Sequence, residues 1–283
     1  MANLNKRIVY CIVLYGVELE ESETFITLIH SFRMSNKKNK LNISVFDNTP
    51  RDDDKRETYF YEFDNFIEVN YFTENINRGL PYAYNKMVDI GHELNMEYIV
   101  LLDQDTTLPI DFYEKYVTNS SLSNINCPVV RSNNVIISPC KINNYRCSPF
   151  KKINLGEMEL NKLSCINSGM MVSIPFFREI GGYNERLFLD FCDHDFIDKV
   201  KVKEKMINVI DVCLEQDFSN DVHTYEQSKH RYSIYIKDLK EYYKGRNWLK
   251  VFLYVDLPHV LQLSLTHKSF YFIKKRFLNY GQK

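Results

Sequence analysis

The sequence predicts an α/β fold: a mostly parallel central sheet flanked by helices, followed by a C-terminal helical extension. Strand-like apolar runs alternate with amphipathic helical segments through about the first 120 residues, the pattern of a parallel sheet with helical crossovers. Residues 98–102 are apolar without alternation, as expected for a strand buried on both faces. Later segments read as helical, so we expect a main domain over residues 1–225 and an extension over residues 226–283.

The composition indicates a cytoplasmic protein with a substantial core. The chain has 283 residues, 45% of them hydrophobic, and a net charge of −1 that gives no reason to expect nucleic acid as a partner. Its seven cysteines contain no C-x-x-C pair, which fits a reducing compartment better than a disulfide framework. No apolar run approaches the 18 or more residues of a membrane-spanning helix.

The first predicted strand covers residues 7–15 and ends at Tyr15. A helix over residues 22–34 follows, and a second strand over residues 43–46 ends at Asp47. An acid at the end of a strand of such a sheet could contact a nucleobase or ribose, because ligands bind at the carboxyl ends of the strands. An ordinary Asx turn explains Asp47 equally well.

A third strand, residues 66–72, leads into a loop that has the features of an anion site. Asn77 offers a side-chain donor, Arg78 a fixed positive charge, and Gly79 allows close approach of the backbone. The helix that begins after this loop adds the partial positive charge of its N-terminus.

Two carboxylates follow the buried strand, at Asp103 and Asp105. Side chains at i and i+2 of extended chain project to the same side, with Cα atoms roughly 7 Å apart. This spacing suits one Mg²⁺ or Mn²⁺ ion with sites left for phosphate oxygens. The alternative is that both acids form a turn and cap the helix that Pro109 opens.

The second half is less regular. We expect a helix from 109 to about 119, two short apolar runs within 127–137, and a loop over 143–156. An apolar segment over 164–174 is interrupted at Gly169, which suggests a bend or a close backbone approach. A short helix at 176–180 and a strand at 207–214 complete the domain.

A second acidic cluster lies at Asp193 and Asp195, among apolar residues. Such surroundings raise the pKa of a carboxyl group toward neutrality, as a general base requires. Either acid could instead cap the helix predicted over 194–205, a role compatible with chemistry.

The C-terminal segment is basic and aromatic, with no acid after Asp256. It could lie on an anionic membrane surface, which would place the protein peripherally on the inner face of the plasma membrane. A solvated helix packed on the main domain explains the segment at least as well.

Three groups of segments together resemble the family 2 glycosyltransferases of the GT-A fold, most closely the bacterial rhamnosyltransferase-like branch. The resemblance covers about residues 7 to 215 and depends on the order and spacing of the segments. They are Val-Phe-Asp-Asn-Thr at 45–49, the loop at 75–85 with Leu-Leu-Asp-Gln-Asp-Thr at 101–106, and Ser-Gly-Met-Met-Val at 168–172 with the stretch 180–195.

The resemblance implies a nucleotide-sugar donor (a dTDP- or UDP-sugar) and transfer with inversion to a hydroxyl of a glycan or lipid-linked acceptor, in surface polysaccharide synthesis. Residues 1–225 would then be the nucleotide-sugar-binding and catalytic domain. By the family pattern Asp47 resembles the nucleobase contact, and Asn77 and Gly79 belong to the donor-binding loop. We also expect Tyr15, Arg78, Asn85 and Asp103 to bind the donor.

The resemblance also assigns the metal and the base. Asp103 and Asp105 match the metal-binding Asp-x-Asp, with Mg²⁺ or Mn²⁺ as cofactor. Asp193 stands at the catalytic base, but Cys192 replaces the Glu that precedes it in the family, so Asp195 stays an alternative. His223 could be a third metal ligand or simply a structural histidine.

Two other functions are compatible with the same residues. A nucleotidyltransferase or metal-dependent phosphohydrolase could use the Asp pair, and would release pyrophosphate or phosphate instead of a nucleoside diphosphate. A non-catalytic carbohydrate-binding protein of the same fold would tolerate Asp193→Asn. Neither the sugar nor the acceptor is encoded in a readable pattern.

Overall fold

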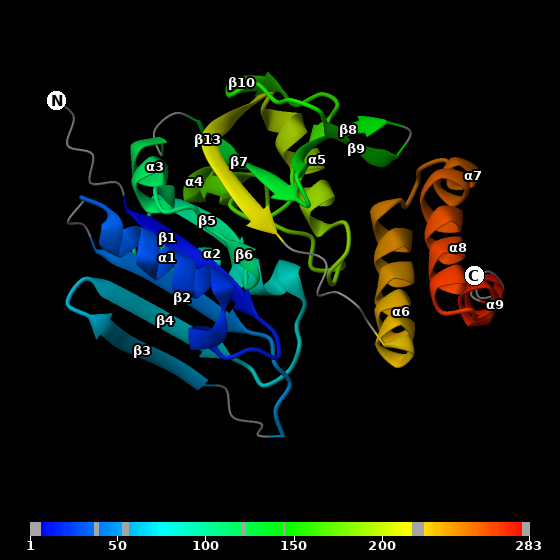
Figure 1. Cartoon of the computed structure of the whole chain (residues 1–283), viewed down its shortest axis with the longest axis horizontal. Helices are drawn as coiled ribbons and strands as arrows, with labels where there is room; N and C mark the ends of the chain where they lie inside the picture. Colours follow the sequence, from blue (N-terminus) through cyan, green and yellow to red (C-terminus); the bar gives the residue numbers. More distant parts are fainter. Residues whose placement is uncertain are drawn as a thin grey trace.

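The first half of the chain alternates strands and helices, as predicted. The structure, a computed structural model, describes residues 7–36, 40–52, 57–119, 123–143, 145–216 and 224–278. Strands β5, β1, β2 and β4 pair in parallel in that order, so their carboxyl ends share one edge (Figure 1). The elements of this half are β1 (Ile8–Leu14), η1 (Leu19–Glu21), α1 (Glu23–Met34), β2 (Leu41–Asp47), β3 (Glu57–Asp64), β4 (Ile67–Thr73), α2 (Leu80–Glu93), β5 (Tyr98–Asp103), β6 (Thr106–Thr107) and α3 (Phe112–Asn119).

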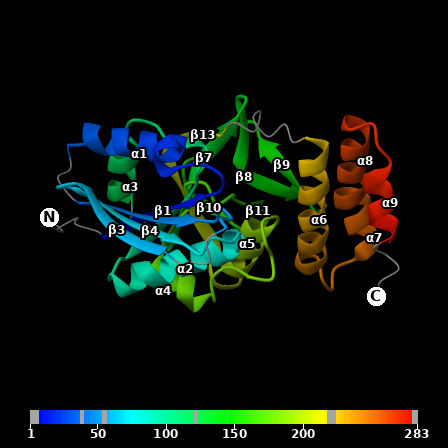
Figure 2. The ribbon, with the colours of Figure 1, turned by 90° about the horizontal axis from the view of Figure 1, so that it is seen from below.

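The sheet separates two hydrophobic cores. Strand β1 is buried throughout and alternates between them, with Tyr10 and Ile12 packed in the core of α1 and α3. Val9 and Cys11 face the other core, which includes side chains of α2. Figure 2 shows α1 and α3 on one face of the sheet and α2 and α4 (Ile174–Glu179) on the other. This burial of both faces explains why the central strands read as uninterrupted apolar runs.

The second half extends the same sheet with mixed pairing. Strand β12 lies antiparallel between β5 and β7, and β7 pairs in parallel with β13. Helix α5 precedes β13, and β10 pairs with the outer side of β13. The bounds are β7 (Ile125–Ser132), β8 (Val135–Asn143), β9 (Arg146–Phe150), β10 (Gly156–Glu159), β11 (Leu163–Ser164), β12 (Met171–Ser173), α5 (Cys192–Lys203) and β13 (Met206–Gln216).

Several peripheral strands were not predicted from the sequence, among them β9 and β3. The loop expected over 143–156 contains β9, which forms an antiparallel hairpin with β8. Strand β3 pairs antiparallel with β4 at the end of the sheet, where no strand was predicted. Edge strands tolerate charge and proline, because one side of their backbone has no strand partner, and so they carry weak sequence signals.

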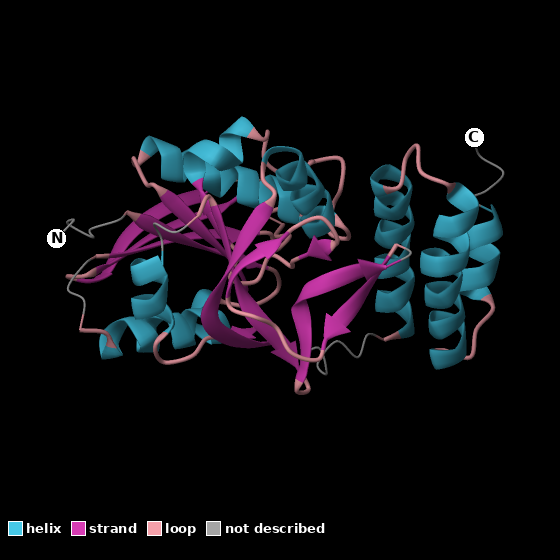
Figure 3. Cartoon of the chain, turned by 90° about the horizontal axis from the view of Figure 1, so that it is seen from above, coloured by secondary structure: helices cyan, strands magenta, loops and turns pink. Residues whose placement is uncertain are grey.

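Four helices and a π-helical turn form the C-terminal extension: α6 (Tyr225–Tyr242), α7 (Trp248–Val251), η3 (Phe252–Asp256), α8 (Leu257–Thr266) and α9 (Tyr271–Leu278). They gather at one end of the molecule (Figure 3). Helix α6 begins at a capping box between Thr224 and Gln227. Among the described residues, no helix is long and apolar enough to cross a membrane.

Candidate active site

A cavity of about 720 Å³ lies at the carboxyl ends of β1, β2 and β5, where the sequence analysis placed the ligand. Five predicted site residues line it: Tyr15, Asn77, Gly79, Asp103 and Asp105. The other lining residues are Val13, Asn48, Leu80, Gln104, Phe188, Leu189, Gln216, Glu226, Gln227, His230, Arg231 and Ile234. Helix α6 therefore closes a cavity whose base is the parallel sheet.

The turn that carries Asp103 and Asp105 is fixed by the start of α1 and the end of β1. Thr24 Oγ1 donates to the Asp103 carbonyl at 2.5 Å, and Ser22 Oγ donates to the Gln104 carbonyl at 2.8 Å. The Tyr15 backbone N–H donates to Gln104 Oε1 at 2.8 Å. The backbone of the turn is thus positioned before any ligand arrives.

The Asp103 carboxylate is oriented by two hydroxyl groups. Tyr84 Oη donates to Oδ1 at 3.1 Å, and Ser168 Oγ donates to Oδ2. Ser168 reaches this position through a bend at Gly169, where φ is +79° and a Cβ would lie 2.6 Å from Leu214 and Pro128. Burial raises the pKa of Asp103 despite these hydrogen bonds, and the nearby Asp193 carboxylate raises it further. A bound cation would have the opposite effect, because its positive charge would compensate the negative charge of these carboxylates.

The oxygen donors present fit a hard divalent cation. Asp105 is exposed and lines the same cavity, and each Asp103 oxygen has a lone pair beyond the one that its hydroxyl donor uses. Within the described ranges, no group of three His, Cys, Asp or Glu side chains is arranged to hold a metal ion. The proposed third ligand, His223, lies outside the described residues.

Asp193 and Asp195 have different surroundings, although both lie in the first turn of α5. Asp193 is close enough to Asp103 to raise its pKa. Asp195 lies 3.7 Å from Lys199 Nζ, and the charges that act on it are those of Lys199, Asp198 and Arg246. Of the two acids, Asp193 is therefore the one whose charge acts on Asp103.

His194 is held beside Asp193. Its Nδ1 lies 2.6 Å from Ser164 Oγ, and its Nε2 lies 3.7 Å from Cys147 Sγ. Burial alone would lower the pKa of His194, but the Asp193 carboxylate and the Cys147 thiol outweigh it and raise the pKa to about 9. A protonated imidazole consequently stands next to Asp193 at neutral pH.

The backbone N–H groups of the loop before α2 donate to other protein groups. The expectation was that this loop would bind an anion. The Arg78 N–H donates to Asn48 Oδ1 at 3.0 Å, and the Gly79 N–H donates to Asn77 Oδ1 at 2.9 Å. The Leu80 N–H donates to the Phe188 carbonyl at 2.9 Å. Gly79 is needed for this packing, because a Cβ there would lie 2.5 Å from the Phe188 oxygen.

Three predicted donor-binding residues, Arg78, Asn85 and Asp47, do not line the cavity. Arg78 forms an ion pair with Glu74 at 2.7 Å and lies over the Tyr82 ring. The Asn85 amide joins α2 to the following segment, accepting from the Tyr183 N–H at 2.9 Å and donating to Glu185 at 2.8 Å. Arg78 and Asn85 are both occupied in holding the walls of the site.

Asp47 forms the Asx turn that was the alternative to a ligand contact. Its Oδ1 accepts from the Thr49 N–H at 2.9 Å, while Oδ2 accepts from Arg51 at 2.8 Å and from Tyr71 at 2.7 Å. The side chain is fully buried, and its neighbour Asn48 lines the cavity in its place.

The contribution of α6 was missed by the sequence analysis. Asp238 accepts three backbone hydrogen bonds, from Phe188, Leu189 and Asp190 at 2.8 to 2.9 Å. Arg231 forms a bidentate ion pair with Asp190. The helix thereby shapes the wall opposite the Asp-x-Asp turn, and no sequence spacing relates residues 231 and 238 to residue 190.

No protein-family model and no curated protein matches the chain, but solved structures share its fold. GalNAc-T7, crystallised with UDP, GalNAc and Mn²⁺, superposes with a TM-score of 0.56 at 10% identity over 77% of this chain and 45% of that chain. TarS 1–349 of S. aureus gives 0.54 at 13% identity over 88% and 75%. The same protein in complex with UDP-GlcNAc gives 0.52 over 88% and 76%. The chain spans less than half of the GalNAc-T7 structure, and its fold is that of the GT-A glycosyltransferases.

Proposed function

We propose that this chain is a metal-dependent, inverting glycosyltransferase that uses a nucleotide-sugar donor. The observation that carries the proposal is that Asp103 and Asp105 line one cavity at the carboxyl ends of parallel strands, with the charge of Asp193 near enough to raise the pKa of Asp103. A cavity of about 720 Å³ is in the size range of small-molecule and cofactor sites.

The residues divide into two roles. Asp103 and Asp105 would hold Mg²⁺ or Mn²⁺, an ion that neutralises charge on a leaving diphosphate when bound. Asp193 would accept the proton of the acceptor hydroxyl as that oxygen attacks the sugar. The hydroxyls of Tyr84 and Ser168 keep the Asp103 carboxylate in place.

The finer assignment rests on motif order and on what the similar structures hold. The order of the motifs favours a family 2 enzyme of the rhamnosyltransferase-like branch, acting on a glycan or lipid-linked acceptor in surface polysaccharide synthesis. GalNAc-T7 and TarS were crystallised with UDP or UDP-GlcNAc, which places UDP-sugars beside dTDP-sugars as first candidates for the donor. We also propose His223 as a third metal ligand and residues 1–225 as the catalytic domain.

A panel of nucleotide sugars tests the proposal, with Mn²⁺, with Mg²⁺ and with EDTA. We expect at least one donor to raise the melting temperature only with a divalent ion, and to release a nucleoside diphosphate when an acceptor is added. A panel without any shift or release overturns the proposal. Release of pyrophosphate or free phosphate indicates the nucleotidyltransferase or phosphohydrolase alternative. Donor binding that is never followed by release indicates a carbohydrate-binding protein.

We further propose that α8 and α9 contact the inner face of the plasma membrane. Among the residues they present to solvent are Leu261, Leu265, Phe277 and Leu278, exposed by 44% to 77%. No acid follows Asp256 in the sequence, and Lys268 and Lys274 are exposed in the same region. Apolar side chains with interspersed lysines suit an anionic lipid surface.

A further inference from the structure

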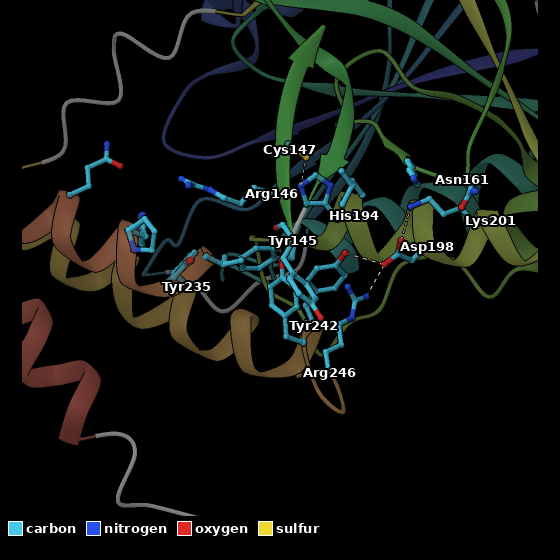
Figure 4. Close-up of a pocket in the computed structure, with 18 residues that line it drawn as sticks. Tyr145, Arg146, Cys147, Asn161, His194, Asp198, Lys201, Tyr235, Tyr242 and Arg246 are labelled. Carbon is cyan, nitrogen blue, oxygen red and sulfur yellow. Dashed lines mark hydrogen bonds and ion pairs between the residues drawn. The ribbon is translucent and has the colours of Figure 1, made fainter. Parts of the chain in front are cut away.

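A second cavity, of about 630 Å³, lies between the β8–β9 hairpin, α5 and the C-terminal helices (Figure 4). One segment of the chain contributes to both cavities: Phe188 and Leu189 line the cavity of the Asp-x-Asp turn, and Phe191 and His194 line the second. Asp193 lies in the same segment, beside His194, whose backbone N–H donates to Asp193 Oδ1 at 2.7 Å.

Cationic groups dominate the second cavity. Its lining includes Arg146, Lys162, Lys201, Arg246 and His194 against a single carboxylate, Asp198. Lys201 and Arg246 share that carboxylate, at 2.9 and 2.8 Å, as the dashed lines in Figure 4 show.

Two of these cations have no acidic partner. In the described part of the chain, neither Arg146 nor Lys162 forms an ion pair, and both side chains are exposed. Uncompensated positive charge in a concave site attracts anions and strengthens their binding.

Aromatic rings form the rest of the wall. Phe191 and Tyr242 stack with centroids 5.3 Å apart, and Tyr145 meets Tyr243 edge to face at 5.8 Å. The Arg246 guanidinium lies over the Tyr242 ring at 4.5 Å. Flat rings beside fixed hydrogen-bond donors can pack against the apolar face of a sugar and bind its hydroxyl groups. The lining therefore matches a sugar ring that carries negative charge.

We propose that this cavity binds the acceptor, and that the acceptor is a sugar bearing a phosphate or a carboxylate. The proposal rests on the proposed function, because Asp193, the neighbour of the lining residue His194, would take the proton of the acceptor hydroxyl. Arg146 and Lys162 would contact the anionic substituent, while the edges of the aromatic residues that line the cavity would contact the sugar ring.

Titration calorimetry with the full chain tests the assignment, using glucose 6-phosphate and glucuronic acid as probes. Glucose is the matched probe that lacks the negative charge, and inorganic phosphate is the one that lacks the sugar ring. We expect both anionic sugars to bind, and glucose and phosphate each to bind at least about tenfold more weakly, a difference of about 1.4 kcal/mol. Equal binding of glucose and glucose 6-phosphate, or of phosphate and glucose 6-phosphate, overturns the proposal.

Variants locate the binding. The double variant Arg146→Gln/Lys162→Gln should weaken glucose 6-phosphate binding about tenfold or more, because both charged hydrogen-bond donors to the phosphate are lost. Lys86→Gln, an exposed lysine on α2, is the control and should bind like the wild type. Unchanged affinity in the double variant places the anion elsewhere and overturns the assignment.

UDP binding separates this proposal from the proposed function. The double variant should bind UDP with Mn²⁺ as the wild type does, since neither residue lines the first cavity. If the wild type binds no nucleotide but still binds glucose 6-phosphate through Arg146 and Lys162, the proposed function fails while the anionic sugar site stands. If nucleotide binds and the anionic sugars do not, only the second cavity has been misassigned.

Discussion

At the scale of residues, two aspartates that are close in sequence have different neighbours in the fold. Asp193 and Asp195 both lie in the first turn of α5, but Asp193 raises the pKa of Asp103, whereas Asp195 lies near Lys199. Both acids could be identified from the sequence, because an acid within an apolar segment stands out. Which of them is the better candidate for the base could not be predicted, because the residues that distinguish them come from other elements.

We expect Asp193→Asn to lower turnover by about 100-fold or more, because an amide cannot accept the acceptor proton and general base catalysis typically contributes about 10² to 10⁴. Donor binding should be largely kept. The matched variant Asp195→Asn should change turnover by less than about tenfold, well below that range. Steady-state rates with the donor and acceptor from the panel provide the comparison, and a larger loss in Asp195→Asn would reverse the assignment.

The limits of residue-level prediction are visible at Asp47 and in the Asn77 loop. From the sequence, Asp47 lies at the end of a strand, and an Asx turn and a ligand contact explain it equally well. The structure shows that Asp47 is occupied by Thr49, Arg51 and Tyr71. Arg51 and Tyr71 come from a loop and a neighbouring strand, so their approach depends on the tertiary fold.

At the scale of elements, α6 is the part of the site that sequence reasoning did not supply. Central strands and helices were predictable because their apolar residues follow periods of 2 and 3.6. The docking of α6 on the 188–190 segment has no such signal. It depends on Asp238, which is 1% exposed and accepts from three successive backbone amides.

Asp238→Ala should lower the free energy of unfolding by about 3 kcal/mol, because three backbone donors lose a charged acceptor. UDP affinity should fall as well, since Phe188 and Leu189 line the cavity. Lys237→Ala, at an exposed position of the same helix, controls for the loss of a side chain. Urea unfolding curves that coincide for the two variants would show that Asp238 does not anchor the segment.

At the scale of the whole molecule, α6, α8 and α9 lie together at one end (Figure 1). Helix α6 lines the site, whereas α8 and α9 expose apolar side chains to solvent. Part of the C-terminal segment packs inward, as the packed-helix alternative expected: Phe272 is buried, and Arg276 forms a buried ion pair with Asp256. The remainder faces outward, including Leu265 and Phe270 at 76% and 74% exposure.

The full chain should co-sediment with vesicles of phosphatidylcholine and phosphatidylglycerol, and much less with phosphatidylcholine alone. Leu265→Ser/Phe270→Ser should weaken this binding, because both side chains would otherwise enter the lipid surface. Ile26→Ser, at an exposed apolar position on α1, should have no effect. Equal sedimentation of the double variant and the wild type would contradict the membrane proposal.

The central claim, that the Asp-x-Asp turn and a divalent ion bind a nucleoside diphosphate, is tested most directly by titrating UDP with and without Mn²⁺ into the wild type and Asp105→Asn. We predict that Mn²⁺ tightens UDP binding to the wild type by about tenfold or more, equivalent to about 1.4 kcal/mol. In Asp105→Asn this gain should be lost. No UDP binding to the wild type, or a gain from Mn²⁺ that is the same in Asp105→Asn, would contradict the account.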